Sequence, residues 1–247
     1  MNIIWSGIYK NFKSINETKD AFNSQKWVNN LSKEKKIHKP NYNLNKNLHL
    51  QSAENQYLNI FQYLKKKLLL KSKISIADYG GALGSFYFKL SNNIQNTNFD
   101  WHVIEKKNVV KIAKKKFKKE KNLKFKNRIY FKNEIDIFFA GSSMQYINNW
   151  KKLILQFINK DTNIFVLCDL PLVNKTQIIT KQNYFGIYVP VRFYNLKILK
   201  NFFENNGYTL LYKNKFQNYY EKYTSKELKK YNLKFFNFIF IKKKFIK

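Results

Sequence analysis

The sequence contains little cysteine, proline, glycine or arginine. Its single cysteine, Cys168, excludes an internal disulfide and a cysteine-rich metal cluster, and it fits a reducing compartment. The three histidines, His38, His49 and His102, lack the spacing of metal ligands, so we expect no metal site. No apolar run reaches the roughly 18 residues of a membrane span, and the start of the chain does not resemble a signal peptide. We therefore expect a cytoplasmic protein, with peripheral attachment to the inner membrane as an alternative.

The net charge of this 247-residue chain is +32, but it comes almost entirely from lysine. Of 47 basic residues, only Arg128 and Arg192 are arginine. Asparagine occurs 34 times and alanine 6 times, and the abundant Lys, Asn, Ile, Phe and Tyr all have A/T-rich codons. A base-composition bias explains this pattern without a partner, and arginine, which phosphate and base recognition favours, is nearly absent. A nucleic-acid partner is not favoured, and attraction to an anionic substrate or membrane surface is a further alternative.

The length of 247 residues fits one large α/β domain, or a core domain with an N-terminal extension, and the apolar content of 44% is sufficient for a core. Residues 1–50 begin with scattered aromatic residues and end in an Asn-rich stretch at 38–50 that is typical of a loop. We predict an N-terminal arm or lid over residues 1–50, packed on a core domain at residues 51–247.

Hydrophobic periodicity predicts alternating strands and helices in the core domain. The predicted strands are Ile74–Asp78, Asp100–Ile104, Leu123–Phe125, Asp136–Ala140, Ile164–Asp169 (ended by Pro171), Tyr208–Lys213 and Leu233–Ile241. The predicted helices are 52–70, one ending near Asn92, Val109–Glu120, Asn149–Ile158 and Asn195–Asn205. Residues 171–190 are predicted to be a loop. The pattern indicates an α/β fold with a mostly parallel seven-stranded sheet, its last strand antiparallel, and helices on both faces.

A glycine loop follows the first predicted strand. Gly80, Gly81 and Gly84 interrupt the chain before an aromatic run that a helix would bury, as at the start of a βαβ unit. The dinucleotide fingerprint places its acid about 20 residues later, whereas here Asp78 already stands before the glycines. A carboxylate at this point would repel a pyrophosphate and would instead pair with a cationic amino group. A purely structural glycine turn is the alternative.

A second acid, Glu105, ends the next predicted strand, 21 residues after Gly84. A carboxylate has two oxygens, which match the two hydroxyls of a ribose diol. An ordinary surface acid is the alternative. In parallel sheets the ligand lies beyond the carboxyl ends of the strands, where Asp78, Glu105, Ser142–Ser143 and Asp169 are predicted to stand.

The loop Asp78-x-Gly80-Gly81-Ala82-x-Gly84 resembles the D-x-G-x-G-x-G motif of class I S-adenosylmethionine-dependent methyltransferases, with Ala82 in place of the middle glycine. Further segments resemble a family of bacterial methyltransferases that is often associated with surface-polysaccharide gene clusters. These segments are Trp5–Tyr9, Gly141–Ile147, Tyr188–Tyr194 and Glu204–Tyr208. The resemblance implies a Rossmann-like class I methyltransferase domain at residues 51–247 and S-adenosylmethionine as the cofactor, but no settled substrate.

The chain departs from that family at two places. The motif Ser-Ser-x-x-Gln-Tyr-Leu is one residue shorter here, at 142–147. The family's Asp-Arg-Thr-Pro at the end of the fifth strand is Asp169-Leu170-Pro171 in this chain, so the family's arginine and threonine are missing where a substrate contact could otherwise be expected.

The resemblance implies graded roles for the residues at the strand ends. The cofactor's methionine part would be held by Asp78, Gly80, Gly81 and Gly84, and its ribose by Glu105. Ser142 and Ser143 would line the cofactor's amino-acid side or the transferred methyl group. Asp169 is the best-placed general base, and Tyr146 is the second catalytic candidate. Tyr146, Gln145 and Arg192 are candidates for holding the acceptor, with packing or capping as the alternative for each.

We predict a methyltransferase acting on a sugar or other small-molecule intermediate of surface polysaccharide synthesis. Two alternatives are an RNA methyltransferase, suggested by the charge, and a catalytically degenerate scaffold protein, suggested by Ala82 and the shortened motif. The sequence does not predict the methylated atom or the oligomeric state.

Overall fold

The structure is a computed structural model, and it describes residues 3–18, 21–33, 48–68, 72–184, 186–218, 221 and 223–246. The chain divides into two compact units. The glycine-loop unit is Phe22–Gly141, and the strand-rich unit is Met1–Ala21 together with Ser142–Lys247.

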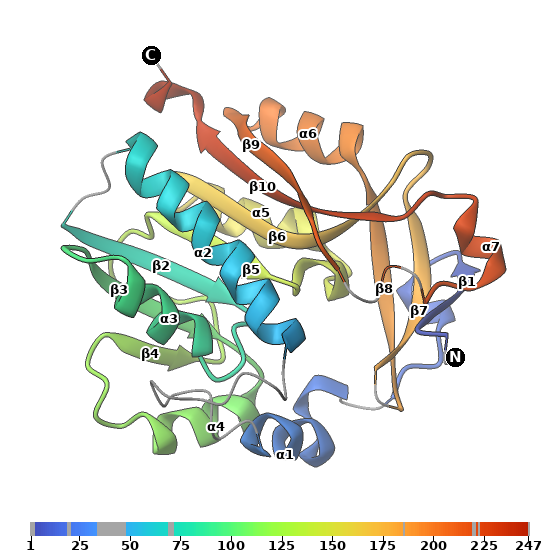
Figure 1. The fold of residues 1–247 in the computed structure, drawn as a ribbon, viewed down its shortest axis with the longest axis horizontal. Coiled ribbons are helices and arrows are strands. Elements are labelled where there is room, and N and C mark those ends of the chain that lie inside the picture. Colours follow the sequence, from blue (N-terminus) through green and yellow to red (C-terminus); the bar gives the residue numbers. More distant parts are fainter. Residues whose placement is uncertain are drawn as a thin grey trace. The chain divides into compact units, whose positions relative to one another are not determined.

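In the glycine-loop unit, four strands run parallel in the order β5-β2-β3-β4 (Figure 1). The strands are β2 (Lys73–Tyr79), β3 (Asn98–Ile104), β4 (Leu123–Lys126) and β5 (Ile137–Gly141). The helices are α1 (Gln25–Lys33), α2 (Leu48–Leu68), α3 (Ser85–Asn93) and α4 (Lys107–Lys116). The predicted strand–loop–helix order is confirmed in this unit.

The core of the glycine-loop unit is an aromatic cluster between α2, α3 and the sheet. Its rings are Tyr57, Phe61, Phe86, Trp101 and Phe139, and the Phe86 and Phe139 centroids lie 5.2 Å apart. Such edge-to-face and tilted pairs add about 0.5–1.5 kcal/mol each beyond their buried area. This cluster fixes α3, and with it the loop that precedes α3, against the strands.

Two predicted helix boundaries in this unit are wrong. α2 begins at Leu48, inside the stretch predicted to be a loop, because extending a formed helix is cheaper than starting one. The rest of that stretch, residues 38–47, lies outside the described residues. α4 ends at Lys116, four residues early, and Phe117 instead stacks on Phe125 with centroids 5.9 Å apart.

The strand-rich unit contains the order β1-β7-β8-β6, and β10 pairs with both β6 and β9. The strands are β1 (Trp5–Tyr9), β6 (Ile164–Val173), β7 (Ile178–Tyr184), β8 (Ile187–Asn195), β9 (Tyr208–Phe216) and β10 (Lys234–Lys242). The helices are α5 (Trp150–Ile158), α6 (Leu196–Asn205) and α7 (Lys226–Lys229). Short 3-10 turns are η1 (Phe12–Ser14), η2 (Ala21–Asn23, at the unit boundary), η3 (Met144–Tyr146) and η4 (Lys243–Phe245).

The last strand, β10, is antiparallel to β6 and to β9, as predicted. The predicted end of α6 is also confirmed, because Gly207 follows it with φ +84°. At the other end of α6, Asn195 caps the helix and accepts a hydrogen bond from the Ile198 amide at 3.2 Å.

The prediction of a loop at residues 171–190 is wrong. β6 continues through Pro171, which pairs with Phe235 next to a register shift, a place where a strand tolerates proline. β7 and β8 then form an antiparallel hairpin, and its turn is closed by the Gly186 amide, which donates to Asn183 Oδ1 at 2.9 Å. The described residues therefore contain three strands beyond the seven predicted: β1, β7 and β8.

The first strand, β1, adds to the edge of β7, with Trp5 opposite Gln182 and only 4% exposed. The α/β class and the mostly parallel sheet are confirmed. The predicted boundary at residue 50 stays a prediction.

Candidate functional site

The first acid of the glycine loop, Asp78, is buried at the carboxyl end of β2. Its side chain is 2% exposed, and Oδ2 accepts a hydrogen bond from Trp101 Nε1 at 2.9 Å. Oδ1 has no hydrogen-bond partner among the described residues. Burial raises the pKa of Asp78 to about 7, and the charge of Glu105 adds to that rise. A buried carboxylate oxygen without a donor is what an ammonium group of a ligand would satisfy.

The backbone of the loop requires the glycines at two positions. A Cβ at Gly81 would lie 2.1 Å from Asp78 Oδ2, so only glycine lets the chain pass beside the carboxylate. Gly84, with φ +74°, precedes α3, and its amide donates to the Gly81 carbonyl at 2.8 Å. Ala82 also has a left-handed φ of +50°, which costs an alanine about 1–2 kcal/mol. This strain explains why the resembling motif has glycine there.

Glu105 follows β3 and reaches back to the same loop. Its Oε1 accepts from the Ala82 amide at 3.2 Å, and its Oε2 accepts from the Lys106 amide at 2.8 Å. Burial raises the pKa of Glu105, and these two amide hydrogen bonds oppose that rise. The structure thus brings Asp78, the three glycines and Glu105 together around one loop.

The predicted residues of the strand-rich unit gather around a β-bulge in β6. Leu167 pairs with Phe238 and Leu170 with Phe236, so two residues, Cys168 and Asp169, stand opposite the single Asn237 of β10. Asp169 has φ +54°, and its amide donates to Asn237 Oδ1 at 3.0 Å. Bulges of this kind re-aim side chains and occur often beside active sites.

The carboxylate of Asp169 has a partner on each oxygen. Ser142 Oγ donates to Oδ2 at 2.5 Å, and Asn218 Nδ2 donates to Oδ1 at 2.8 Å. Ser142 itself has φ +54°, and its amide donates to the Cys168 carbonyl at 3.0 Å. Burial raises the pKa of Asp169 to about 7, against the effect of both hydrogen bonds. A carboxyl group held in this way titrates near neutral pH, as a general base should.

The other predicted residues of this unit lie on or near η3. Ser143 is buried directly before η3. Tyr146 donates its hydroxyl to Gln182 Oε1 at 2.9 Å. Gln145 is buried, and its Oε1 has no partner among the described residues. Arg192 donates from Nη2 to the Asn148 carbonyl at 2.9 Å and lies over the Phe12 ring at 5.2 Å, contacts that anchor local structure.

Sequence reasoning missed the residues that hold the two aspartates. Trp101 binds Asp78, whereas Asn218 and Asn237 bind Asp169. Each is far from its aspartate in the sequence, and asparagine is so common in this chain that no single one stands out. Only the pairing of β6 with β10 identifies Asn237.

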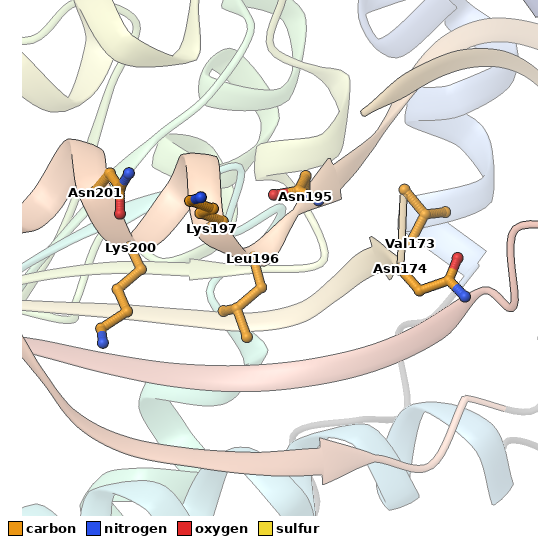
Figure 2. Close-up of a pocket in the computed structure, with 7 residues that line it drawn as sticks. All are labelled: Val173, Asn174, Asn195, Leu196, Lys197, Lys200 and Asn201. Carbon is orange, nitrogen blue, oxygen red and sulfur yellow. The ribbon is translucent and has the colours of Figure 1, made fainter. Parts of the chain in front are cut away.

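A cavity of about 520 Å³ lies at the start of α6, and Figure 2 shows the residues that line it. It is lined by Val173, Asn174, Asn195, Leu196, Lys197, Lys200 and Asn201. None of the predicted site residues lines it, and the Asn195 side chain is already used as the cap of α6. Among the described residues, no helix is long and apolar enough to cross a membrane, and no three His, Cys, Asp or Glu side chains form a group that would hold a metal.

Comparison with known proteins identifies the fold. No family model and no curated protein matches the chain. Magnesium protoporphyrin IX methyltransferase from Synechocystis PCC 6803, with bound S-adenosylhomocysteine, is 10% identical with a TM-score of 0.58, over 90% of this chain and 97% of that one. The 1,6-didemethyltoxoflavin-N1-methyltransferase of Burkholderia thailandensis, with bound 1,6-didemethyltoxoflavin and S-adenosylhomocysteine, is 9% identical with a TM-score of 0.50, over 77% and 78%. The cyclase SpnF is 10% identical with a TM-score of 0.52, over 75% and 81%.

These likenesses establish that the chain has the Rossmann-like fold of class I S-adenosylmethionine-dependent methyltransferases. At such low identities they establish the fold alone, since one fold carries many functions.

Proposed function

We propose that this protein is an S-adenosylmethionine-dependent methyltransferase that acts on a small-molecule acceptor. The observation that carries the proposal is the buried carboxylate of Asp78, one oxygen of which has no partner in the described part of the chain. Gly81 passes so close to this carboxylate that a Cβ would collide with it. The fold supports it, because the solved structures of this fold named above include methyltransferases with bound S-adenosylhomocysteine.

The glycine-loop unit would hold the cofactor through Asp78, Gly80, Gly81, Gly84 and Glu105. Asp78 Oδ1 would accept a hydrogen bond from the ammonium group of the methionine part, which stabilises the ionised carboxylate. Glu105 would exchange its contact with the Ala82 amide for the ribose hydroxyls. When bound, S-adenosylmethionine supplies a methyl group on a positively charged sulfur.

The strand-rich unit would serve the acceptor. Asp169 would accept the proton of the attacking hydroxyl or amine, while Ser142 and Asn218 hold its two oxygens. Ser143 and Tyr146 would line the space for the transferred methyl group and the acceptor. Asn237 is a positioning residue, since it holds the bulge that directs Asp169.

For the acceptor itself we propose a hydroxyl of a sugar or related intermediate of surface polysaccharide synthesis. The sequence resemblance to methyltransferases of such gene clusters supports this choice, and so does a proton acceptor that titrates near pH 7. A carboxylate acceptor would need no such base.

The alternative of a catalytically inactive scaffold has specific support. Ala82 is strained where the resembling motif has glycine, and Glu105 is engaged with the loop's own amides. SpnF, whose name gives it as a cyclase, shares the fold. Cofactor binding without methylation of any sugar nucleotide or RNA would favour the scaffold.

The test is isothermal titration with S-adenosylhomocysteine. We expect saturable binding by the natural chain, and a loss of at least about tenfold in affinity for Asp78→Asn and for Glu105→Gln, corresponding to one charge-assisted hydrogen bond of about 1.5–3 kcal/mol. Glu120→Gln, an exposed acid of the same unit, is the matched control and should bind normally. If folded natural protein binds no S-adenosylhomocysteine, the proposal is wrong.

A further inference from the structure

One face of the sheet in the glycine-loop unit is polar where β2 and β3 begin and along β4. β3 alternates apolar and polar residues, and Trp101 faces the aromatic cluster, so its neighbours Asp100 and His102 face the other way. In the parallel pairing of β3 with β4, Lys124 stands beside His102 and shares its face. Strands buried on both faces of a parallel sheet are apolar throughout. This alternation therefore indicates a face that does not pack against a helix.

A cavity of about 470 Å³ lies on this polar face, a size typical of small-molecule sites. Its strand residues are Lys73, Ser75, Asp100, His102, Lys124 and Lys126, and the connection at 130–136 supplies the rest of the lining. Neither Asp78 nor Glu105 lines it. The cavity is thus separate in its residues from the proposed cofactor site.

Four lysines and three acids line the cavity, so the lysines exceed the acids by one: Lys73, Lys124, Lys126 and Lys132 against Asp100, Glu134 and Asp136. Asp100 accepts a hydrogen bond from Lys124 Nζ at 2.6 Å. Lys126 Nζ donates to the Tyr130 carbonyl at 2.8 Å and lies 4.5 Å from the centre of the Phe131 ring, but it forms no ion pair with a described carboxylate. Burial and repulsion from Lys124 lower the pKa of Lys126. An anion between the two lysines would relieve this repulsion.

His102 adds a specific unmet hydrogen bond. The residue is 8% exposed, and its Nε2 lies 3.2 Å from Asp100 Oδ2. Burial lowers the pKa of His102, so the neutral ring donates from Nε2 and leaves Nδ1 as an acceptor. Nδ1 has no partner among the described residues. A neutral imidazole nitrogen accepts one hydrogen bond, and a hydroxyl group of a ligand can donate it.

We propose that this cavity binds a small hydroxylated molecule that carries a phosphate group. Lys124 and Lys126 bind the phosphate group, and His102 Nδ1 accepts a hydrogen bond from a hydroxyl group. The two requirements together exclude a bare phosphate and an uncharged polyol as the preferred ligand. The inference does not depend on the proposed methyl transfer.

Titration of histidine-labelled protein by NMR tests the site, with the His102 signal assigned from the His102→Gln variant. The probes are glucose 1-phosphate, which does not react with lysine amines, and inorganic phosphate and glucose as its two halves. We expect a saturable shift of the His102 signal with glucose 1-phosphate, at least fivefold weaker binding of phosphate, and no response to glucose. Lys124→Gln and Lys126→Gln should each weaken the binding of glucose 1-phosphate at least fivefold. Lys160 is an exposed lysine outside the cavity, so Lys160→Gln should leave this binding unchanged.

The His102→Phe variant separates recognition from charge attraction. It should bind glucose 1-phosphate no more tightly than inorganic phosphate, with phosphate binding unchanged. If His102→Phe does not fold, the three lysine variants still decide the question. Equal weakening by Lys124→Gln and Lys160→Gln would overturn the proposal in favour of general charge attraction. Binding of a short RNA in place of any response to glucose 1-phosphate would overturn it as well.

Discussion

Two buried aspartates, one in each unit, have pKa values raised in the same direction but have different surroundings. Asp78 and Asp169 both titrate near pH 7 because burial penalises their charge. Within the described ranges, Asp78 accepts from one donor, Trp101, and its other oxygen has no partner. Asp169 has a neutral donor on each oxygen, Ser142 and Asn218.

The difference indicates two kinds of chemistry. A carboxylate with an unmet oxygen gains most from a cation that arrives with a ligand, so Asp78 is suited to binding. A carboxylate held on both sides changes little in position when it gains or loses a proton, so Asp169 is suited to proton transfer. The predictions below test this division, from the largest expected effect to the smallest.

Replacing the proposed base should remove activity and leave cofactor binding in place. For Asp169→Asn we expect methyl transfer to sugar nucleotides to fall by about 10²–10⁴-fold, the usual contribution of a general base. Radiolabelled methyl transfer measures the rate, and titration with S-adenosylhomocysteine should give an unchanged affinity. An equal loss of cofactor affinity would contradict the division of roles.

Asn218→Ala sharpens the same test. The Asn218 amide lowers the pKa of Asp169, so its removal should raise that pKa and shift the acid limb of the kcat profile to higher pH. A fall in kcat without this shift would assign Asn218 a structural role only.

Cofactor affinity should depend on pH through Asp78. Since its pKa of about 7 in the ligand-free protein favours the protonated form at lower pH, and an ammonium group prefers the ionised form, affinity should rise with pH. We expect the affinity for S-adenosylhomocysteine to increase by about tenfold from pH 6 to pH 8, which lie one pH unit below and above the pKa of Asp78. Asp78→Asn is the control, and a pH dependence that survives in it would assign the effect to Glu105.

Ala82 and Ser142 both have a left-handed backbone, but replacing each with glycine should change the free energy of unfolding in opposite directions. Ala82→Gly relieves a left-handed alanine whose methyl group forms no polar contact, so we expect a gain of about 1 kcal/mol in the free energy of unfolding. Ser142→Gly relieves the same strain but removes the donor to buried Asp169, which costs about 1–3 kcal/mol. Denaturant unfolding measures both, with helical Ala113→Gly as a control that should destabilise. A loss of stability in Ala82→Gly would refute the strain at that position.

The sequence predicts the local features of this molecule well. The run from Ile74 to Phe86 specifies strand, loop and helix within a few residues, because periodicity and glycine act over short distances. The position of Glu105 follows in the same way, from the end of the next apolar run. Asparagine at 195 and glycine at 207 correctly mark the ends of α6.

The rest depends on contacts between distant segments. Residues 171–190 have weak periodicity, and the strand β7 forms there because it pairs with β1 on one side and with β8 on the other. Asn237 acquires a role only through the extra residue in β6 that produces the bulge. Sequence reasoning also placed Arg192 near the acceptor, whereas its contacts are with Asn148 and Phe12, and that role stays a prediction.

The bulge in β6 contains a thiol whose reactivity reports on the opening of this strand. Cys168, the only thiol in the chain, is 1% exposed and stands beside Asp169, and burial raises its pKa well above the ordinary value. A protonated, enclosed thiol does not react with alkylating reagents while the sheet is closed. Its rate of modification therefore measures how often the strand carrying Asp169 opens, without any label being introduced.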